Sequence, residues 1–214
     1  MEERKYIFVV FEKTTLGMGK FIRAVTGFPY NHAGISFSED IGTIYSFSRK
    51  YKKAPFYGGF VAESPLRLKN GKRTGKIKIC AVPLKKKDFS EAENYIAEMF
   101  EEREKYIYNM ISAALFPFGI RAEIKNSFTC AEFVLSMLKN FTDIKFREKK
   151  VFYSIKELSE VLEPYKIYEG SGEKFLSGAA WGKDSFSEDK SFFFLLGKTI
   201  GNNAELLKRF IKKH

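Results

Sequence analysis

The segment His32–Ser38, which reads His-Ala-Gly-Ile-Ser-Phe-Ser, and the segment Tyr45–Ser48, which reads Tyr-Ser-Phe-Ser, decide the fold class. In both segments the odd-numbered residues are apolar and the even-numbered residues are small or polar, His32 included. Because successive side chains of a strand point to opposite faces, this alternation predicts two strands, each with one buried face. The turn-forming stretch Glu39–Gly42 between them makes a hairpin. On this pattern His32 lies on the same face as Ser46 and Ser48, away from the apolar layer.

A second stretch, Ser127–Glu132, reads Ser-Phe-Thr-Cys-Ala-Glu and predicts the start of a helix. Thr129 and Glu132 have the spacing of a capping box, in which each side chain binds the other residue's backbone N–H. Cys130 then occupies the first helical position, where free N–H groups and the helix dipole favour the thiolate. The same N–H groups can hold the oxyanion of a tetrahedral intermediate. The sequence therefore predicts Cys130 as a nucleophile.

His32 is the candidate base for this thiol. The chain has two histidines, and the other is the terminal His214. An imidazole is the usual partner that activates a nucleophilic cysteine. A structural role remains the alternative for each residue, since a cysteine can be a small buried hydrophobe and a histidine a structural donor. The second cysteine, Cys80, lies in an alternating strand over Lys76–Val82 and is interpreted as a packing residue.

The third position of the site has three candidates. Ser46 and Ser48 share the predicted face of His32, and Ser46 is the preferred orienter of the imidazole. Glu63, which follows the Gly58-Gly59 turn, can substitute from another strand. A serine hydroxyl stabilises an imidazolium less than a carboxylate does.

The two motifs together resemble those of a known superfamily. Asn31–Ser36 looks like the H-x-G/A-I strand of papain-like NlpC-type hydrolases, and Phe128–Val134 looks like their C-S/A-E/Q-F/L-V nucleophile helix. His32 precedes Cys130 by 98 residues, an order that matches the circularly permuted branch. That branch includes the bacterial YiiX-like proteins and is related to the lecithin–retinol acyltransferase type. The resemblance covers roughly Tyr6 to Tyr165.

The resemblance implies an α+β, permuted papain-like fold: a curled antiparallel sheet or small barrel packed against the helix that carries the nucleophilic cysteine. It also implies Cys130 as nucleophile, His32 as base and a polar third residue. The expected function is a cysteine-dependent hydrolase that cleaves a peptide-like or isopeptide-like amide through an acyl-enzyme, with no cofactor. One alternative is a lipid acyltransferase or thioesterase on the same machinery. The other is a catalytically weak basic binding module.

Composition sets limits on compartment and partners. The 214 residues carry a formal net charge of +11, which suits an anionic surface, but the lysines are scattered and no recognised nucleic-acid motif is present. We therefore expect a small-molecule, peptide or lipid acyl substrate and no specific nucleic-acid binding. Two cysteines and two histidines are too few for a zinc cage, so no metal site is expected, with a site built from carboxylates alone as the alternative. No stretch has the length of a membrane span and no secretory signal is visible, so the default expectation is a cytoplasmic protein.

The composition changes near Tyr168, which predicts a boundary. Residues 1–167 are expected to form the catalytic domain. Residues 168–214 are expected to form a Gly/Ser-rich linker followed by a basic amphipathic helix over Ser191–Lys213. For this helix, docking on the domain is favoured over binding to a membrane surface.

Overall fold

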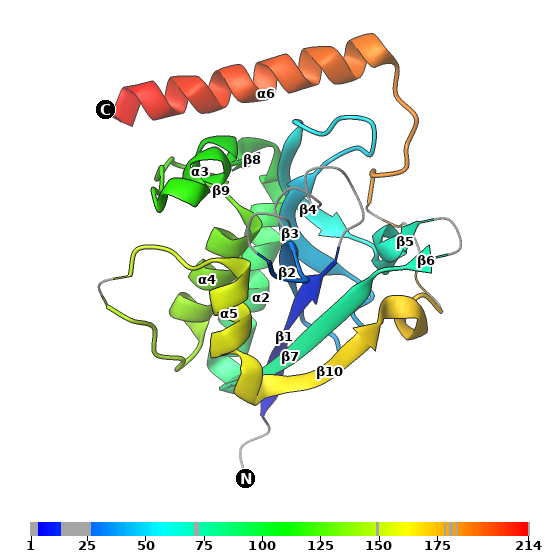
Figure 1. The fold of residues 1–214 in the computed structure, drawn as a ribbon, viewed down its shortest axis with the longest axis vertical. Coiled ribbons are helices and arrows are strands. Elements are labelled where there is room, and N and C mark those ends of the chain that lie inside the picture. Colours follow the sequence, from blue (N-terminus) through cyan, green and yellow to red (C-terminus); the bar gives the residue numbers. More distant parts are fainter. Residues whose placement is uncertain are drawn as a thin grey trace.

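The computed structural model describes residues 4–13, 27–70, 73–148, 150–177, 179, 182 and 184–213. Its centre is one large mixed sheet, with helices packed on it and the long C-terminal helix lying across one end (Figure 1). The strands of this sheet are β1 (Lys5–Glu12), β2 (His32–Ser36), β3 (Ile44–Arg49), β4 (Gly58–Glu63), β7 (Lys76–Leu84), β8 (Ile107–Tyr108), β9 (Ser127–Phe128) and β10 (Lys166–Ser171). A separate short pair joins β5 (Lys69–Asn70) to β6 (Arg73–Thr74).

The helices of the described residues are α2 (Lys86–Glu101), α3 (Met110–Leu115), α4 (Cys130–Phe141), α5 (Ile155–Val161) and α6 (Phe192–Lys213). Short 3-10 turns occur at η1 (Pro65–Leu68), η2 (Arg103–Lys105), η3 (Phe116–Phe118), η4 (Glu163–Tyr165) and η5 (Gly172–Phe175). The chain is therefore of the α+β class, as the sequence predicts. Across the described residues, no helix is long and apolar enough to cross a membrane.

The sheet departs from the expected curled antiparallel sheet or small barrel. Its order is β10-β7-β1-β2-β3-β4-β8-β9, so the strands at its two ends are not paired with each other. The pairs are antiparallel except β8 with β9, which run parallel over Ile107↔Ser127 and Tyr108↔Phe128. The segment before α4 adds β9 at one edge, in parallel with β8, and the segment after α5 adds β10 at the other edge. These two strands widen the sheet and do not close it.

The register of the central strands confirms the predicted alternation. Ile35 lies opposite Tyr45 on the β2–β3 pair, and Ser46 lies opposite Val61 on the β3–β4 pair. Since directly opposed residues share a face, His32, Ser46 and Glu63 all lie on one face of the sheet. Gly34 is needed where β2 passes β3, because a Cβ there would lie 2.5 Å from Ile44 Cγ2 and 2.9 Å from the Tyr45 carbonyl oxygen.

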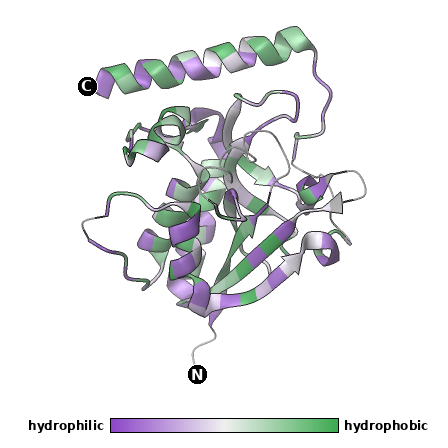
Figure 2. Ribbon diagram, viewed as in Figure 1, coloured by the Kyte–Doolittle hydropathy of each residue, from purple (hydrophilic) through white to green (hydrophobic). Residues whose placement is uncertain are grey.

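The tail is not separated from the sheet at the predicted boundary. The expected break between residues 167 and 168 falls inside β10, which pairs with β7 along Lys166–Ser171. The linker expected after it contributes the buried Asp184 to the body of the protein. The alternation of Gly and Ser with polar residues describes an edge strand as well as it describes a linker. The predicted helix is present as α6, along which hydrophobic and hydrophilic residues alternate (Figure 2).

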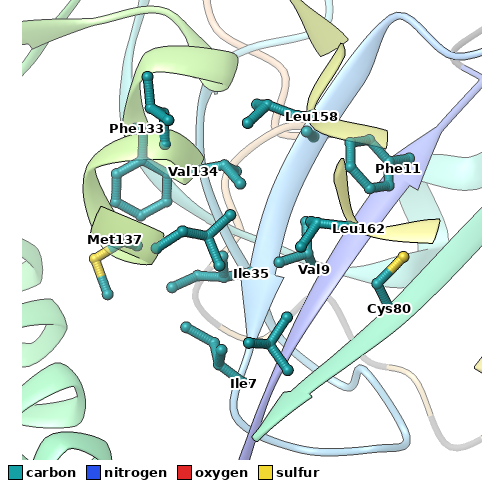
Figure 3. Close-up of a cluster of buried hydrophobic side chains, with 14 of the residues drawn as sticks. Ile7, Val9, Phe11, Ile35, Cys80, Phe133, Val134, Met137, Leu158 and Leu162 are labelled. Carbon is teal, nitrogen blue, oxygen red and sulfur yellow. The ribbon is translucent and has the colours of Figure 1, made fainter. Parts of the chain in front are cut away.

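The main core fills the space between the sheet and the helices α2, α4 and α5. Figure 3 shows strand side chains facing Phe133, Val134 and Met137 of α4. This cluster uses the odd-numbered residues of the central strands, such as Ile7, Val9, Phe11, Ile35 and Phe47. A second buried cluster covers the other face, with Val10, Ile44, Leu68, Ile77 and Ile79 among its members. Because both faces of the sheet are covered, the polar side chains of the second face, which include Glu12, His32, Ser46 and Glu63, are buried.

Candidate active site

Cys130 lies at the start of α4, as predicted. The Thr129 hydroxyl accepts from the Glu132 N–H, and the Glu132 carboxylate accepts from the Thr129 N–H at 2.7 Å. This capping box fixes Cys130 as the first residue of the helix, where backbone N–H groups lack helical partners. The side chain is 5% exposed. The thiol thus sits at an electropositive helix end with narrow access to solvent.

His32 is the first residue of β2, and its imidazole hydrogen-bonds the Cys130 side chain. Each residue begins its element, and α4 packs directly on β2. The imidazole Nε2 lies 2.7 Å from Glu63 Oε1, which leaves Nδ1 as the ring nitrogen for the sulfur. The predicted pairing of Cys130 with His32 is therefore present in the structure.

The third position belongs to Glu63 and not to the preferred Ser46. Ser46 donates its hydroxyl proton to Glu63 Oε1, the same oxygen that contacts His32. Ser48 is placed further off and accepts from Arg67 at 3.3 Å. The reason is side-chain length: β3 lies between β2 and β4, and a glutamate on β4 can reach over Ser46 to the imidazole. Ser46 therefore hydrogen-bonds Glu63, and Ser48 hydrogen-bonds Arg67, which is the neighbour of Glu63.

Two residues missed by the sequence reasoning extend the network. Arg67 Nη1 donates to Glu63 Oε2 at 3.0 Å, so the two carboxylate oxygens face different cations. The guanidinium also binds Asp184 in a bidentate pair, with Nε to Oδ2 at 2.7 Å and Nη2 to Oδ1 at 2.5 Å. Asp184 accepts from the Ser64 N–H as well, at 2.8 Å. All four side chains are buried, so the chain Asp184–Arg67–Glu63–His32 is shielded from water.

The charges of this network set the protonation of its members. Burial alone would lower the pKa of His32, but the Glu63 carboxylate and the hydrogen bonds to Cys130 and Glu63 hold it well above its usual value. Burial alone would raise the pKa of Glu63, but His32, Arg67 and the Ser46 hydroxyl lower it to about 2. The pair is therefore an imidazolium and a carboxylate at neutral pH.

A further buried carboxyl group, Glu12, lies on the same face. It is directly opposite His32 in the β1–β2 register and is 2% exposed. Burial, opposed by His32 and assisted by Glu63, raises its pKa to about 7. Near neutral pH, Glu12 therefore changes charge beside the base.

Tyr108 on β8 interacts with Cys130 from another side. Its hydroxyl hydrogen-bonds the Cys130 side chain, and burial raises its pKa well above the usual value, with Cys130 and Glu132 adding to the rise. The phenol therefore stays protonated and can donate a hydrogen bond at the sulfur. No sequence pattern singled out this residue, because β8 has only two residues and pairs with distant segments.

Cys130 opens into a pocket of about 860 Å³ formed mainly by α3, η3, the start of α4 and the segment 150–160. Aromatic side chains contribute much of the wall. Charged side chains line it as well, from Arg121, Glu132, Lys150, Lys156, Glu157 and Glu160. The aromatic members are Phe28, Tyr30, Tyr108, Phe116, Phe152 and Tyr153. A pocket with apolar walls and a few polar groups suits an organic substrate with an apolar part.

The other cysteine has none of these features. Cys80 is fully buried in the main core, and burial raises its pKa to about 12. It packs as the sequence predicts. Among the described residues, no cluster of three or more His, Cys, Asp or Glu side chains could hold a metal ion.

Comparisons with known proteins name no family for this arrangement. No family model matches the chain, and no solved structure matches it. One curated protein is similar: the uncharacterized protein YlxY of Bacillus subtilis (strain 168), 36% identical over 84 residues. The similarity covers 32% of this chain, which spans about a quarter (26%) of the length of that relative.

Proposed function

We propose that the chain is a cysteine hydrolase that cleaves an acyl bond through an acyl-enzyme on Cys130. The observation that carries this proposal is that His32 interacts with Cys130 on one side and with Glu63 on the other, with Cys130 at the N-terminus of α4. A nucleophile, a base and an orienting carboxylate in hydrogen-bond contact form the general pattern of nucleophilic catalysis. The permuted papain-like fold, on the order of His32 before Cys130, is part of the same proposal.

In the proposed reaction the Cys130 thiolate attacks the substrate carbonyl carbon, and His32 holds the proton that the thiol has released. The oxyanion is stabilised by the free N–H groups of the first turn of α4 and by the Tyr108 hydroxyl. When the carbon–nitrogen or carbon–oxygen bond breaks, His32 gives its proton to the leaving group. Water then gives a proton to His32 and attacks the thioester, which releases the acid and the free thiol. Glu63 keeps the imidazole oriented throughout and stabilises its charged form.

A peptide-like or isopeptide-like amide is the first substrate class of this proposal. The pocket favours a second candidate, a lipid acyl ester or thioester, because its aromatic walls can hold an apolar acyl chain. Turnover is favoured over a weak binding module. The binding-module alternative rests on the net charge of +11 and on a serine as the third residue, and the buried carboxylate of Glu63 beside His32 favours turnover.

The test is acylation of the full chain by p-nitrophenyl hexanoate, followed by mass spectrometry of the intact protein and its peptides. We expect one acyl group on Cys130 in the wild type and in the control Cys80→Ala. Cys130→Ala should give none while keeping its thermal stability. An adduct confined to Cys80, or equal p-nitrophenol release from wild type and Cys130→Ala, would overturn the proposal. A panel of N-acyl and O-acyl substrates then separates the amide class from the lipid class.

A further inference from the structure

The C-terminal helix α6 carries two apolar stripes, and the fold uses one of them. Leu195 packs beside Ala54 and Tyr57, and Leu206 packs beside Ile107 and Ile124. Side-chain amides fix the same side of the helix: Asn202 donates to the Gly58 carbonyl at 3.2 Å, and Asn203 donates to the Phe56 carbonyl at 2.9 Å. These contacts dock α6 on the body of the protein, as expected for an amphipathic helix.

The second stripe faces away from the body. It consists of Phe193, Leu196, Ile200, Leu207 and Ile211, whose exposed fractions range from 42% to 82%. Their spacings of three, four, seven and four residues keep them on one side of a helix with 3.6 residues per turn. Phe192, exposed by 70%, lies beside Phe193 at the start of the helix, whereas Phe194 packs against Tyr51 of the body. Protein surfaces normally carry single, scattered apolar residues. A continuous apolar strip along a helix of 22 residues is a larger exposed apolar area than that.

Cations border this stripe. The helix contains five basic residues and one acidic residue, Glu205, and its exposed basic side chains are Lys198, Lys208, Lys212 and Lys213. Lys208 and Lys212 are four residues apart, about one helical turn, and both lie beside the stripe. The ion pairs that these lysines make are at the surface: Lys208 lies 3.9 Å from Glu205, and Lys213 lies 2.9 Å from Glu123. Exposed pairs of this kind are weak, so the lysines remain available to an anionic partner.

We propose that α6 is a membrane-surface helix that docks the protein on an anionic lipid bilayer. The exposed stripe would enter the boundary between headgroups and acyl chains, and the lysines beside it would meet lipid phosphates. Exposed phenylalanines at one end and basic residues on the flank are the composition of such helices. A second copy of this chain is a poorer occupant, because two molecules of net charge +11 would repel each other. The inference stands apart from the chemistry at Cys130.

The experiment is co-sedimentation of the full chain with vesicles of phosphatidylcholine alone and of phosphatidylcholine with 30% phosphatidylglycerol. We expect binding to the anionic vesicles that weakens as salt rises, and at least tenfold weaker partition to the neutral ones. The variant Phe193→Ser/Ile200→Ser/Leu207→Ser should lose at least tenfold in partition at unchanged melting temperature. The variant Lys208→Glu/Lys212→Glu should lose a similar factor.

Matched controls are Ile167→Ser, an exposed apolar residue of β10, and Lys86→Glu/Lys87→Glu, which reverses two exposed charges at the start of α2. Both controls should bind as the wild type does. Three results would overturn the proposal. The first is no binding to anionic vesicles, and the second is binding that survives the stripe variant. The third is a concentration-dependent dimer in sedimentation velocity that the stripe variant abolishes, since a second copy would then cover the helix.

Discussion

The Nε2 atom of His32 lies 2.7 Å from Oε1 of Glu63, with both side chains buried between β2 and β4. Between them the Ser46 hydroxyl, on the intervening strand β3, binds the same carboxylate oxygen. This contact fixes the orientation of the imidazole, because the carboxylate accepts the proton on Nε2 and leaves Nδ1 toward Cys130. The first two predictions address it.

Replacing Glu63 by Gln should lower the acylation rate of Cys130 by about 10²- to 10³-fold, roughly 3–4 kcal/mol of barrier. The amide carries no charge to stabilise the imidazolium, so the pKa of His32 should fall. NMR of the imidazole carbons measures this directly, since the chain has two histidines and His214 serves as the internal reference. Glu98→Gln, at an exposed position of α2, is the control. An unchanged His32 titration in Glu63→Gln would contradict the assigned role.

Ser46→Ala should reduce acylation about tenfold, roughly 1.4 kcal/mol, since Ser46 acts through Glu63. The carboxylate would lose one hydrogen bond but keep those from His32 and Arg67. The pKa of Glu63 should rise, because the hydroxyl is one of the groups that lower it. Single-turnover acylation by an activated ester across pH is the measurement. A loss as large as that of Glu63→Gln would mean that Ser46 contacts the reacting groups itself.

Alkylation should distinguish the two cysteines. Iodoacetamide at pH 7 should modify one thiol per chain, at Cys130, at least about tenfold faster than Cys80. Cys80 is fully buried, and its raised pKa of about 12 keeps it a thiol. Peptide mapping after limited labelling is the measurement, with Cys80→Ala expected to keep the fast phase. Equal labelling of both cysteines in the folded protein would argue against a special environment for Cys130.

Local patterns predicted the positions of Cys130 and His32 correctly, since Cys130 begins a helix and His32 lies in a strand. The capping box at Thr129 and Glu132 depends on residues three apart, and the face of His32 depends on alternation within one strand. The capping box lies within a few residues of Cys130, and the alternation lies within a few residues of His32. The preference for Ser46 over Glu63 as the partner of the imidazole was wrong. Alternation along a strand predicts which face of the sheet a side chain is on, but not how far that side chain extends. A glutamate on β4 spans the strand between, and a serine does not.

The remaining parts of the site depend on pairings that leave no local trace. Arg67 and Asp184 are 117 residues apart and meet because the segment after β10 returns to η1. The predicted boundary at 167 failed for the same reason: the tail pairs with β7 and supplies a buried anion. A shift in composition reports a change of local environment, and a Gly-rich edge strand produces the same shift as a linker does.

Asp184 should therefore be needed for the site although it lies in the tail. Asp184→Asn removes one partner of a buried ion pair, which typically costs about 3–5 kcal/mol of unfolding free energy. Arg67 would then hold Glu63 less firmly, and acylation should slow. Asp189→Asn is the control in the same segment, since its pair with Lys53 is exposed and worth little. Denaturant unfolding and acylation rates that match for the two variants would show that the buried pair has no such role.

The last prediction concerns Glu12, the buried carboxyl group opposite His32. Burial raises its pKa from 4.5 to about 7, so the folded chain keeps this proton between pH 4.5 and 7 while the unfolded chain releases it. The unfolded state binds fewer protons in that window, and the free energy of unfolding must fall as pH rises through it. Above pH 7 the folded protein carries a buried charge, and Glu12→Gln removes that cost. We expect the variant to be more stable than the wild type at pH 8, by roughly 3 kcal/mol at most, and equally stable at pH 4.5. Urea unfolding at the two pH values measures the difference, with the exposed Glu98→Gln as the control. A gain of the same size at both pH values would place its origin in packing and not in the ionisation of Glu12.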